Sequence, residues 1–189
     1  MSALPQYHQM TESEYLTFER ENSIRHEYID GEVFAMSGAS EAHNLICGNL
    51  ITTLNMQLRE RPCRVYPSDM RVKVESLYTY PNVTIVCDKP QFMDDTFDTL
   101  MNPLVIIEVL SSSTEKYDRG RKFQEYRRLA SLQDYVLVSQ ESHRLEYYAR
   151  QINNQWTLTD VEGLDSKVML QSIGCILSLQ DVYLKVSFE

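Results

Sequence analysis

The sequence lacks any long hydrophobic run, and no apolar segment approaches the roughly 20 residues that a membrane-spanning helix needs. Its first residues also lack the basic start and the apolar stretch of a secretory signal peptide. These two absences argue against a membrane protein and against a secreted one. We therefore expect a cytoplasmic protein.

Cysteine is scarce and scattered. The four cysteines, Cys47, Cys63, Cys87 and Cys175, form no CxxC pair and have no histidine nearby at zinc-finger spacing. This spacing disfavours a structural zinc site. In a reducing compartment we expect the four side chains to be small buried hydrophobes.

Positive charge is also in short supply, because the formal net charge is −9. That is the wrong sign for a protein that coats nucleic acid without specificity. The segment 115–128 is the exception, since it holds six of the 18 basic side chains against three acidic ones. Contacts with phosphate are therefore expected there, at Lys116, Arg119 and Arg121. The alternative is a solvated helix face stabilised by charge pairs.

The size and composition are those of one folded α/β domain over residues 1–189, with 43% hydrophobic residues to form a core. A capping box at Thr11 and Glu14 predicts a short helix over 12–21. Asp30-Gly31 between two extended runs predicts a β-hairpin. A second helix is expected from Ser40 until Pro62 stops it.

The second half of the chain predicts a parallel crossover. Residues 104–110 are almost unbroken apolar sequence, which is typical of a strand buried on both faces. An amphipathic helix over 115–130, capped within 111–114, and a strand over 134–138 follow, so the two strands should be parallel neighbours. Extended pieces at 145–149 and 156–161 predict a C-terminal hairpin at the sheet edge.

Glu108 is the most informative side chain. A carboxylate near the end of an apolar strand costs several kcal/mol to bury unless it has a partner. Metal coordination, an ion pair with Lys122 or Arg121, or a raised pKa would each reduce that cost. A functional site and a purely structural ion pair both remain open on this observation.

Several segments together resemble the Uma2 family of the PD-(D/E)xK restriction-endonuclease-like superfamily. The most specific is the Glu-Val-Leu-Ser run at 108–111 with Tyr117-Asp118, Lys122 and Tyr126 after it. The others are 81–86, 102–107, the Asp30-Gly31-Glu32 turn, the helix start near His43, and 68–72. The resemblance covers nearly the whole chain. It implies a mixed central sheet flanked by helices, with an N-terminal hairpin and a C-terminal β-hairpin.

The resemblance also implies a chemistry, which is Mg²⁺- or Mn²⁺-dependent endonuclease cleavage of DNA phosphodiester bonds. Transferred to this chain, Glu108 is a metal ligand, the Val109 carbonyl is a second ligand and Lys122 is the catalytic lysine. The usual lysine position two residues after the glutamate holds Leu110. An ordinary i, i+4 pair of Lys122 with Asp118 is the structural alternative.

Asn82 is the departure from the family pattern, which has an aspartate directly after the proline. Asn82 can offer an amide oxygen to a metal but brings no negative charge. We therefore expect weak metal binding and impaired cleavage, unless Asp69 or Asp88 compensates. A catalytically inactive module that binds nucleic acid or protein is the alternative, and a structural dimer module without nucleic acid is a third.

Three further positions are candidates with plainer alternatives. Glu32 is a candidate metal ligand or an exposed hairpin carboxylate. His43 is a candidate phosphate contact or a capping or core histidine. Arg71 is a candidate nucleic-acid contact or an ordinary strand-surface residue. By analogy with related nucleases, we also expect a homodimer.

Overall fold

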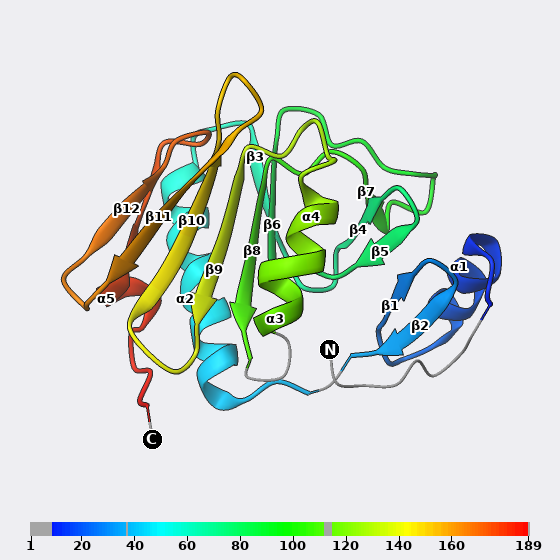
Figure 1. Cartoon of the computed structure of the whole chain (residues 1–189), viewed down its shortest axis with the longest axis horizontal. Coiled ribbons are helices and arrows are strands. Elements are labelled where there is room, and N and C mark those ends of the chain that lie inside the picture. Colours follow the sequence, from blue (N-terminus) through cyan, green and yellow to red (C-terminus); the bar gives the residue numbers. More distant parts are fainter. Residues whose placement is uncertain (1–8, 37, 112–114, 189) are drawn as a thin grey trace.

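The computed structural model describes residues 9–36, 38–111 and 115–188. Its largest sheet has six strands in the order β11-β10-β9-β8-β6-β3 within the described residues (Figure 1). In chain order these strands are β3 (Cys63–Pro67), β6 (Val83–Cys87), β8 (Val105–Leu110), β9 (Asp134–Ser139), β10 (Arg144–Arg150) and β11 (Trp156–Glu162). The pair β8–β9 is parallel and the other pairs are antiparallel. The expected crossover and the mixed sheet are confirmed.

The two faces of this sheet carry different helices (Figure 1). On one face α2 (Glu41–Leu58) packs Ile46, Leu50, Leu54 and Leu58 against the sheet, with α5 (Leu179–Val182) beside it. On the other face lies the helical segment formed by α3 (Glu115–Tyr117), a π-helical turn (Asp118–Lys122) and α4 (Phe123–Tyr126). The helix expected over 115–130 is therefore shorter and contains a wide turn. The expected cap residues 112–114 lie outside the described residues.

A second sheet is built around the N-terminal hairpin. Its order is β2-β1-β5-β4-β7. The strands are β1 (His26–Ile29), β2 (Glu32–Ala35), β4 (Arg71–Val74), β5 (Leu77–Thr79) and β7 (Thr99–Leu100). The hairpin turn has positive φ angles at Asp30 (49°) and Gly31 (97°), as a tight two-residue turn requires. Helix α1 (Glu12–Glu21) begins at the expected capping box of Thr11 and Glu14 and packs on this sheet through Tyr15 and Leu16.

The C-terminal part adds two hairpins. The expected pair β10–β11 lies at the edge of the large sheet. A further hairpin, β12 (Lys167–Leu170) with β13 (Cys175–Ser178), was not predicted from the sequence, nor were β5 and β7. No helix in the described part of the chain is both long and apolar enough to cross a membrane.

The cysteines correct one expectation. Cys63 and Cys87 are paired residues in the antiparallel β3–β6 register, and they form a disulfide. The prediction of four separate buried hydrophobes is therefore wrong for these two, because it ignored which strands would become neighbours. Cys47 and Cys175 carry free thiols, and Cys175 is buried.

Candidate active site

Glu108 lies on β8, whose six residues are all buried, and only 3% of its surface is exposed. Its Oε1 atom is 3.0 Å from the Nζ atom of Lys122 and accepts a hydrogen bond from the Tyr126 hydroxyl at 2.9 Å. Both partners come from the helical segment that covers this face of the sheet. The carboxylate therefore has the partners that its burial requires.

Lys122, which contacts the strand, lies in the π-helical turn. Asp118 and Lys122 stand at its two ends, and both are buried. Lys122 Nζ lies 3.6 Å from Asp118 Oδ1, so the i, i+4 pair is present together with the contact to Glu108. Wide turns of this kind occur frequently at functional sites. The structural pair with Asp118 is thus present beside the contact with Glu108, and the catalytic role of Lys122 stays a prediction.

A third carboxylate, Glu27 on β1, completes this cluster. Its Oε1 atom lies 3.0 Å from Lys122 Nζ and also accepts a hydrogen bond from the Thr79 hydroxyl. Sequence reasoning selected Glu32 from this hairpin and missed Glu27. The run around Glu27 gave no comparable signal, because Arg25 and His26 make it polar, unlike the apolar run around Glu108. Glu32 pairs with Ile29 at the turn end of the hairpin, and its role as a ligand stays a prediction.

The cluster of Glu27, Glu108, Asp118 and Lys122 has more acidic than basic groups. Burial raises the pKa of Glu108 to about 7, with Lys122 opposing the shift and Asp118 and Glu27 adding to it. Burial by itself would lower the pKa of Lys122, but Glu108 and Glu27 raise it well above its usual value. Lys122 therefore stays an ammonium at neutral pH. It can stabilise negative charge but cannot accept a proton from water.

The raised pKa of Glu108 predicts an unusual dependence of stability on pH. The folded state holds a proton on Glu108 that the unfolded state loses above its pKa of 4.5. This contribution to the free energy of unfolding is present below pH 4.5 and falls as the pH rises toward 7, by on the order of 3 kcal/mol. Glu108→Gln should flatten that fall. Urea unfolding of both proteins between pH 5 and 8 measures it, and equal slopes would contradict the assignment.

Asn82 stands beside Glu108 at the adjoining ends of β6 and β8, one position beyond the Val83–Ile107 pair. The backbone N–H of Asn82 points to Glu108 Oε2 at 3.4 Å. The side-chain Oδ1 of Asn82 accepts a hydrogen bond from the Val109 N–H at 2.7 Å, and Nδ2 lies 3.1 Å from His43 Nε2. The structure thus brings Asn82, Glu108, Val109 and His43 together. It also uses the amide oxygen of Asn82 for a backbone contact.

His43 has a structural and a local polar role at this point. Its backbone N–H donates to the Ser40 hydroxyl at 3.1 Å, at the start of α2. Burial lowers the pKa of the imidazole, which favours the neutral form that accepts a hydrogen bond from the Asn82 amide. The ring therefore lies at the candidate site, as expected, and its contact with phosphate stays a prediction.

The donor set for a divalent metal is incomplete. The described residues contain no group of three or more His, Cys, Asp or Glu side chains arranged around a common metal position. Glu108 Oε2, on the side away from Lys122, is the available carboxylate oxygen, and Asn82 contributes no charge. Asp69 pairs with Arg25 at 3.4 Å, and Asp88 follows the opposite end of β6, so neither replaces the missing carboxylate. Mg²⁺ often relies on one or two carboxylates, waters and substrate phosphates. The residues present therefore fit a weakly held ion that a substrate phosphate completes.

The predicted phosphate contacts of the helical segment differ in their surroundings. Lys116 is exposed. Arg119 pairs with Glu115 at 2.8 Å and also with Glu146. Arg121 pairs with Asp30 at 2.9 Å. A phosphate at either arginine would have to compete with a carboxylate.

Arg71 requires a correction. It was a candidate nucleic-acid contact, with an ordinary strand-surface residue as the alternative, and only 2% of it is exposed. Its guanidinium lies 2.9 Å from Asp98 and donates to the Thr99 hydroxyl at 2.9 Å and to the Tyr80 hydroxyl at 3.1 Å. Because the side chain of Arg71 is buried within the N-terminal sheet, it acts as an internal cross-link between β4 and the segment before β7.

Comparisons with known proteins agree with this architecture. The sequence pattern of the Uma2 family, described as "Putative restriction endonuclease", matches residues 5–180. An uncharacterized protein of Synechocystis sp. is 34% identical over 161 residues, which cover 84% of this chain and 91% of the relative. A second uncharacterized protein of that organism is 34% identical over 181 residues, covering 95% and 94%.

The solved structures give the same fold. A crystal structure from Anabaena variabilis, described as "a putative nuclease belonging to DUF820", superposes with a TM-score of 0.77 at 18% identity. The match covers 92% of this chain and 97% of that one. The fold is thus that of a nuclease-like α/β protein with mixed sheets flanked by helices. By its sequence pattern over residues 5–180, this chain belongs to the Uma2 family.

Proposed function

We propose that this chain is a metal-dependent DNA endonuclease whose cleavage is weak because Asn82 stands where the family has an aspartate. The observation that carries the proposal is the contact of Lys122 with Glu108 at 3.0 Å, next to Asn82 on the adjoining strand. A strand carboxylate and a lysine at one strand end are the arrangement that the family resemblance implies. Family membership supports a nuclease in general, and the metal and the DNA substrate are the proposed part.

Within this proposal the residues of the chain have separate tasks. Glu108 Oε2 would hold Mg²⁺, together with the Val109 carbonyl and weakly with Asn82. When bound, the ion would neutralise charge on the phosphodiester and lower the pKa of a water. Tyr126 fixes the carboxylate of Glu108 through its hydroxyl. Glu27 and Asp118 keep Lys122 protonated, so its ammonium stabilises negative charge that develops on the phosphate.

A plasmid-relaxation assay tests this proposal. Wild-type protein should convert supercoiled plasmid to nicked circles slowly with Mg²⁺ or Mn²⁺ and not with EDTA. Glu108→Gln should lower that rate about tenfold or more, the size of one lost interaction of about 1.4 kcal/mol in the transition state. Equal rates for the two proteins would assign the nicking to a contaminant and contradict the proposal.

One observation favours a second candidate function, an inactive module that binds nucleic acid. The Asn82 side-chain oxygen already accepts a hydrogen bond from the Val109 N–H, so this oxygen has a partner without a metal. Under this alternative, neither Mg²⁺ nor Mn²⁺ supports nicking, yet the protein binds DNA with an affinity that falls steeply with salt. Sedimentation in the same buffers would test the homodimer that we expect for cleavage of two strands.

A further inference from the structure

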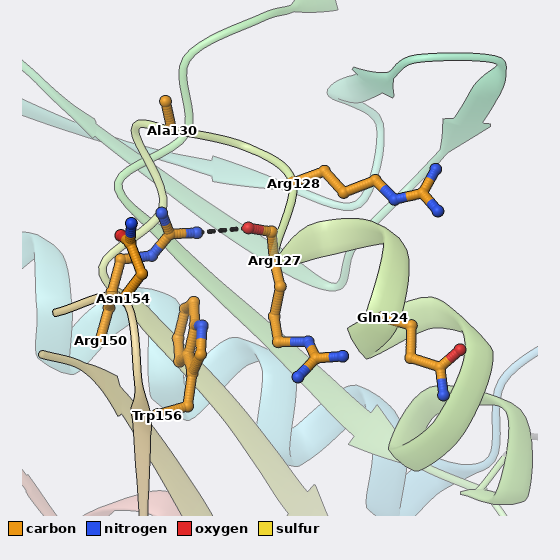
Figure 2. A pocket seen from close by; sticks show the side chains of 7 residues that line it. All are labelled: Gln124, Arg127, Arg128, Ala130, Arg150, Asn154 and Trp156. Carbon is orange, nitrogen blue, oxygen red and sulfur yellow. Dashed lines mark hydrogen bonds between the residues drawn. The ribbon is translucent and has the colours of Figure 1, made fainter.

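A hollow of about 680 Å³ lies at the end of the helical segment, away from Glu108. We call it the arginine hollow, and Figure 2 shows its lining residues: Gln124, Arg127, Arg128, Ala130, Arg150, Asn154 and Trp156. These residues come from the end of α4, the end of β10 and the start of β11. The volume lies within the range of small-molecule binding sites.

The lining is basic in an acidic protein. Three of the residues are arginines and none is acidic, whereas the whole chain has a net charge of −9. Arg128 is matched by Glu75 at 2.6 Å and Glu125 at 3.1 Å, and it extends away from Trp156 (Figure 2). Across the described ranges of the chain, Arg127 and Arg150 have no carboxylate partner. The hollow therefore carries positive charge that the protein itself does not neutralise.

Arg150 is held in place at the edge of the hollow. Its Nη2 atom donates to the carbonyl oxygens of Arg127 at 2.6 Å and Leu129 at 2.9 Å, and its guanidinium stacks over the Trp156 ring at 4.9 Å. These contacts cap the end of α4, which is a structural role. These contacts leave part of the Arg150 guanidinium unpaired, because its Nε atom is buried without a hydrogen-bond partner among the described residues. Since Nε is buried and Nη2 already donates twice, the Nη1 atom of Arg150 is the one that an anion in the hollow could reach.

Arg127 and Trp156 complete the arrangement. The Arg127 guanidinium lies over the Phe123 ring at 5.2 Å, and Phe123 in turn contacts Trp156 edge to face at 5.3 Å. Arginines beside an aromatic ring suit a nucleic-acid strand with unpaired bases, because arginine binds phosphate and the ring offers apolar surface to a base. A duplex keeps its bases stacked inside and cannot use the ring in this way.

We propose that the arginine hollow binds the phosphate backbone of single-stranded nucleic acid, with Arg127 and Arg150 on phosphate and Trp156 against a base. This site is separate from the cluster around Glu108. It deepens the proposed function by naming a surface that holds the nucleic acid, and it rests on that function for the nature of the ligand. It also assigns a role to Arg127, one of the basic residues of the segment 115–128 that follow Lys122.

The chain contains a single tryptophan, so Trp156 fluorescence reports on this hollow alone. A titration in EDTA at low salt uses three probes: a single-stranded oligonucleotide, the same sequence as a duplex, and inorganic phosphate. The single strand should change the fluorescence with saturation, and at least about tenfold more tightly than either other probe. Each factor of ten corresponds to about 1.4 kcal/mol.

Arg127→Ala should weaken binding of the single strand about tenfold and lower the salt slope by about one, as expected for one lost phosphate contact. Arg59→Ala is the matched control, because Arg59 is 83% exposed at the end of α2, on the other face of the large sheet. It removes the same charge and should leave the fluorescence titration unchanged. Arg127→Lys should retain most of the affinity, which separates a lost charge from a folding defect.

Several results would overturn the inference. These are an unchanged Trp156 signal with the single strand, equal losses in Arg127→Ala and Arg59→Ala, and equal affinity for inorganic phosphate or duplex. The test needs no cleavage. Nicking without a Trp156 response would therefore sink this inference alone, and a specific Trp156 response in a protein that never nicks would sink only the endonuclease proposal.

Discussion

Lys122→Met is expected to lower the free energy of unfolding by about 3–5 kcal/mol at pH 8, because it leaves buried carboxylates without their cation. Lys122 is the ammonium that contacts Glu27 and Glu108 at 3.0 Å each and Asp118 at 3.6 Å. Methionine fills a similar volume, so the change tests charge more than packing. Urea unfolding followed by circular dichroism measures the loss.

The loss should shrink in acid. A buried carboxyl that has lost its cation takes up a proton more readily, and the pKa of Glu108 is already raised to about 7. At pH 5.5 the Lys122→Met protein should therefore recover part of its stability relative to wild type. Lys116→Met is the matched control, since Lys116 is an exposed lysine of the same helical segment. It should change the stability by less than about 0.5 kcal/mol. The cluster would have no such role if both variants unfolded at the same urea concentration.

Asn82→Asp is expected to raise the Mg²⁺-dependent nicking rate about 100-fold, because a single preorganised charged group at a reacting centre commonly contributes that much. The new carboxylate would stand next to Glu108 and supply the second negative ligand that the donor set lacks. The contact of Asn82 with the Val109 N–H can survive, since a carboxylate oxygen accepts the same hydrogen bond. Initial rates of plasmid relaxation over a series of Mg²⁺ concentrations measure the gain.

This gain should come with a cost in stability that the metal reverses. Without metal, Asn82→Asp adds a negative charge beside Glu108, and it should unfold at lower urea concentration than wild type. Mg²⁺ should stabilise the variant more than the wild type, because an ion that binds only the folded state shifts the equilibrium by mass action. Asn153→Asp makes the same change of charge at an exposed turn, where Asn153 accepts a hydrogen bond from the Gln155 N–H. It should change neither rate nor metal response. If Asn82→Asp behaved like Asn153→Asp, the inactive binding module would be the better account.

The sequence alone predicted the elements whose signals are local. The capping box at Thr11 and Glu14 marked the start of α1, and Asp30-Gly31 marked the β1–β2 turn, because each depends on residues a few positions apart. The apolar run of β8 revealed a buried strand, and Glu108 stood out within it. These patterns together identified the fold class and Glu108, the strand residue of the candidate site.

Tertiary structure decided which distant residues meet. Glu27 joins Lys122 and Glu108 because β1 pairs with β5, whose Thr79 hydroxyl lies 3.3 Å from the Tyr126 hydroxyl of the helical segment, and no local pattern encodes that packing. The same holds for Arg71, whose burial depends on Asp98 and Tyr80, and for Cys63 with Cys87, which the β3–β6 register brings together.

The arginine hollow shows the same division. The basic residues Arg127 and Arg128 were visible in the sequence within 115–128, but Arg150 and Trp156 join them only because the end of β10 and the start of β11 lie beside the last turn of α4. Sequence patterns predict hydrogen bonds and burial among residues that are close in the chain. Contacts between strands and helices depend instead on how the sheets pack. The sequence by itself therefore determined the family, the strand with Glu108 and the substitution at Asn82. The packing of the two sheets around one helical segment decided which charges surround Lys122.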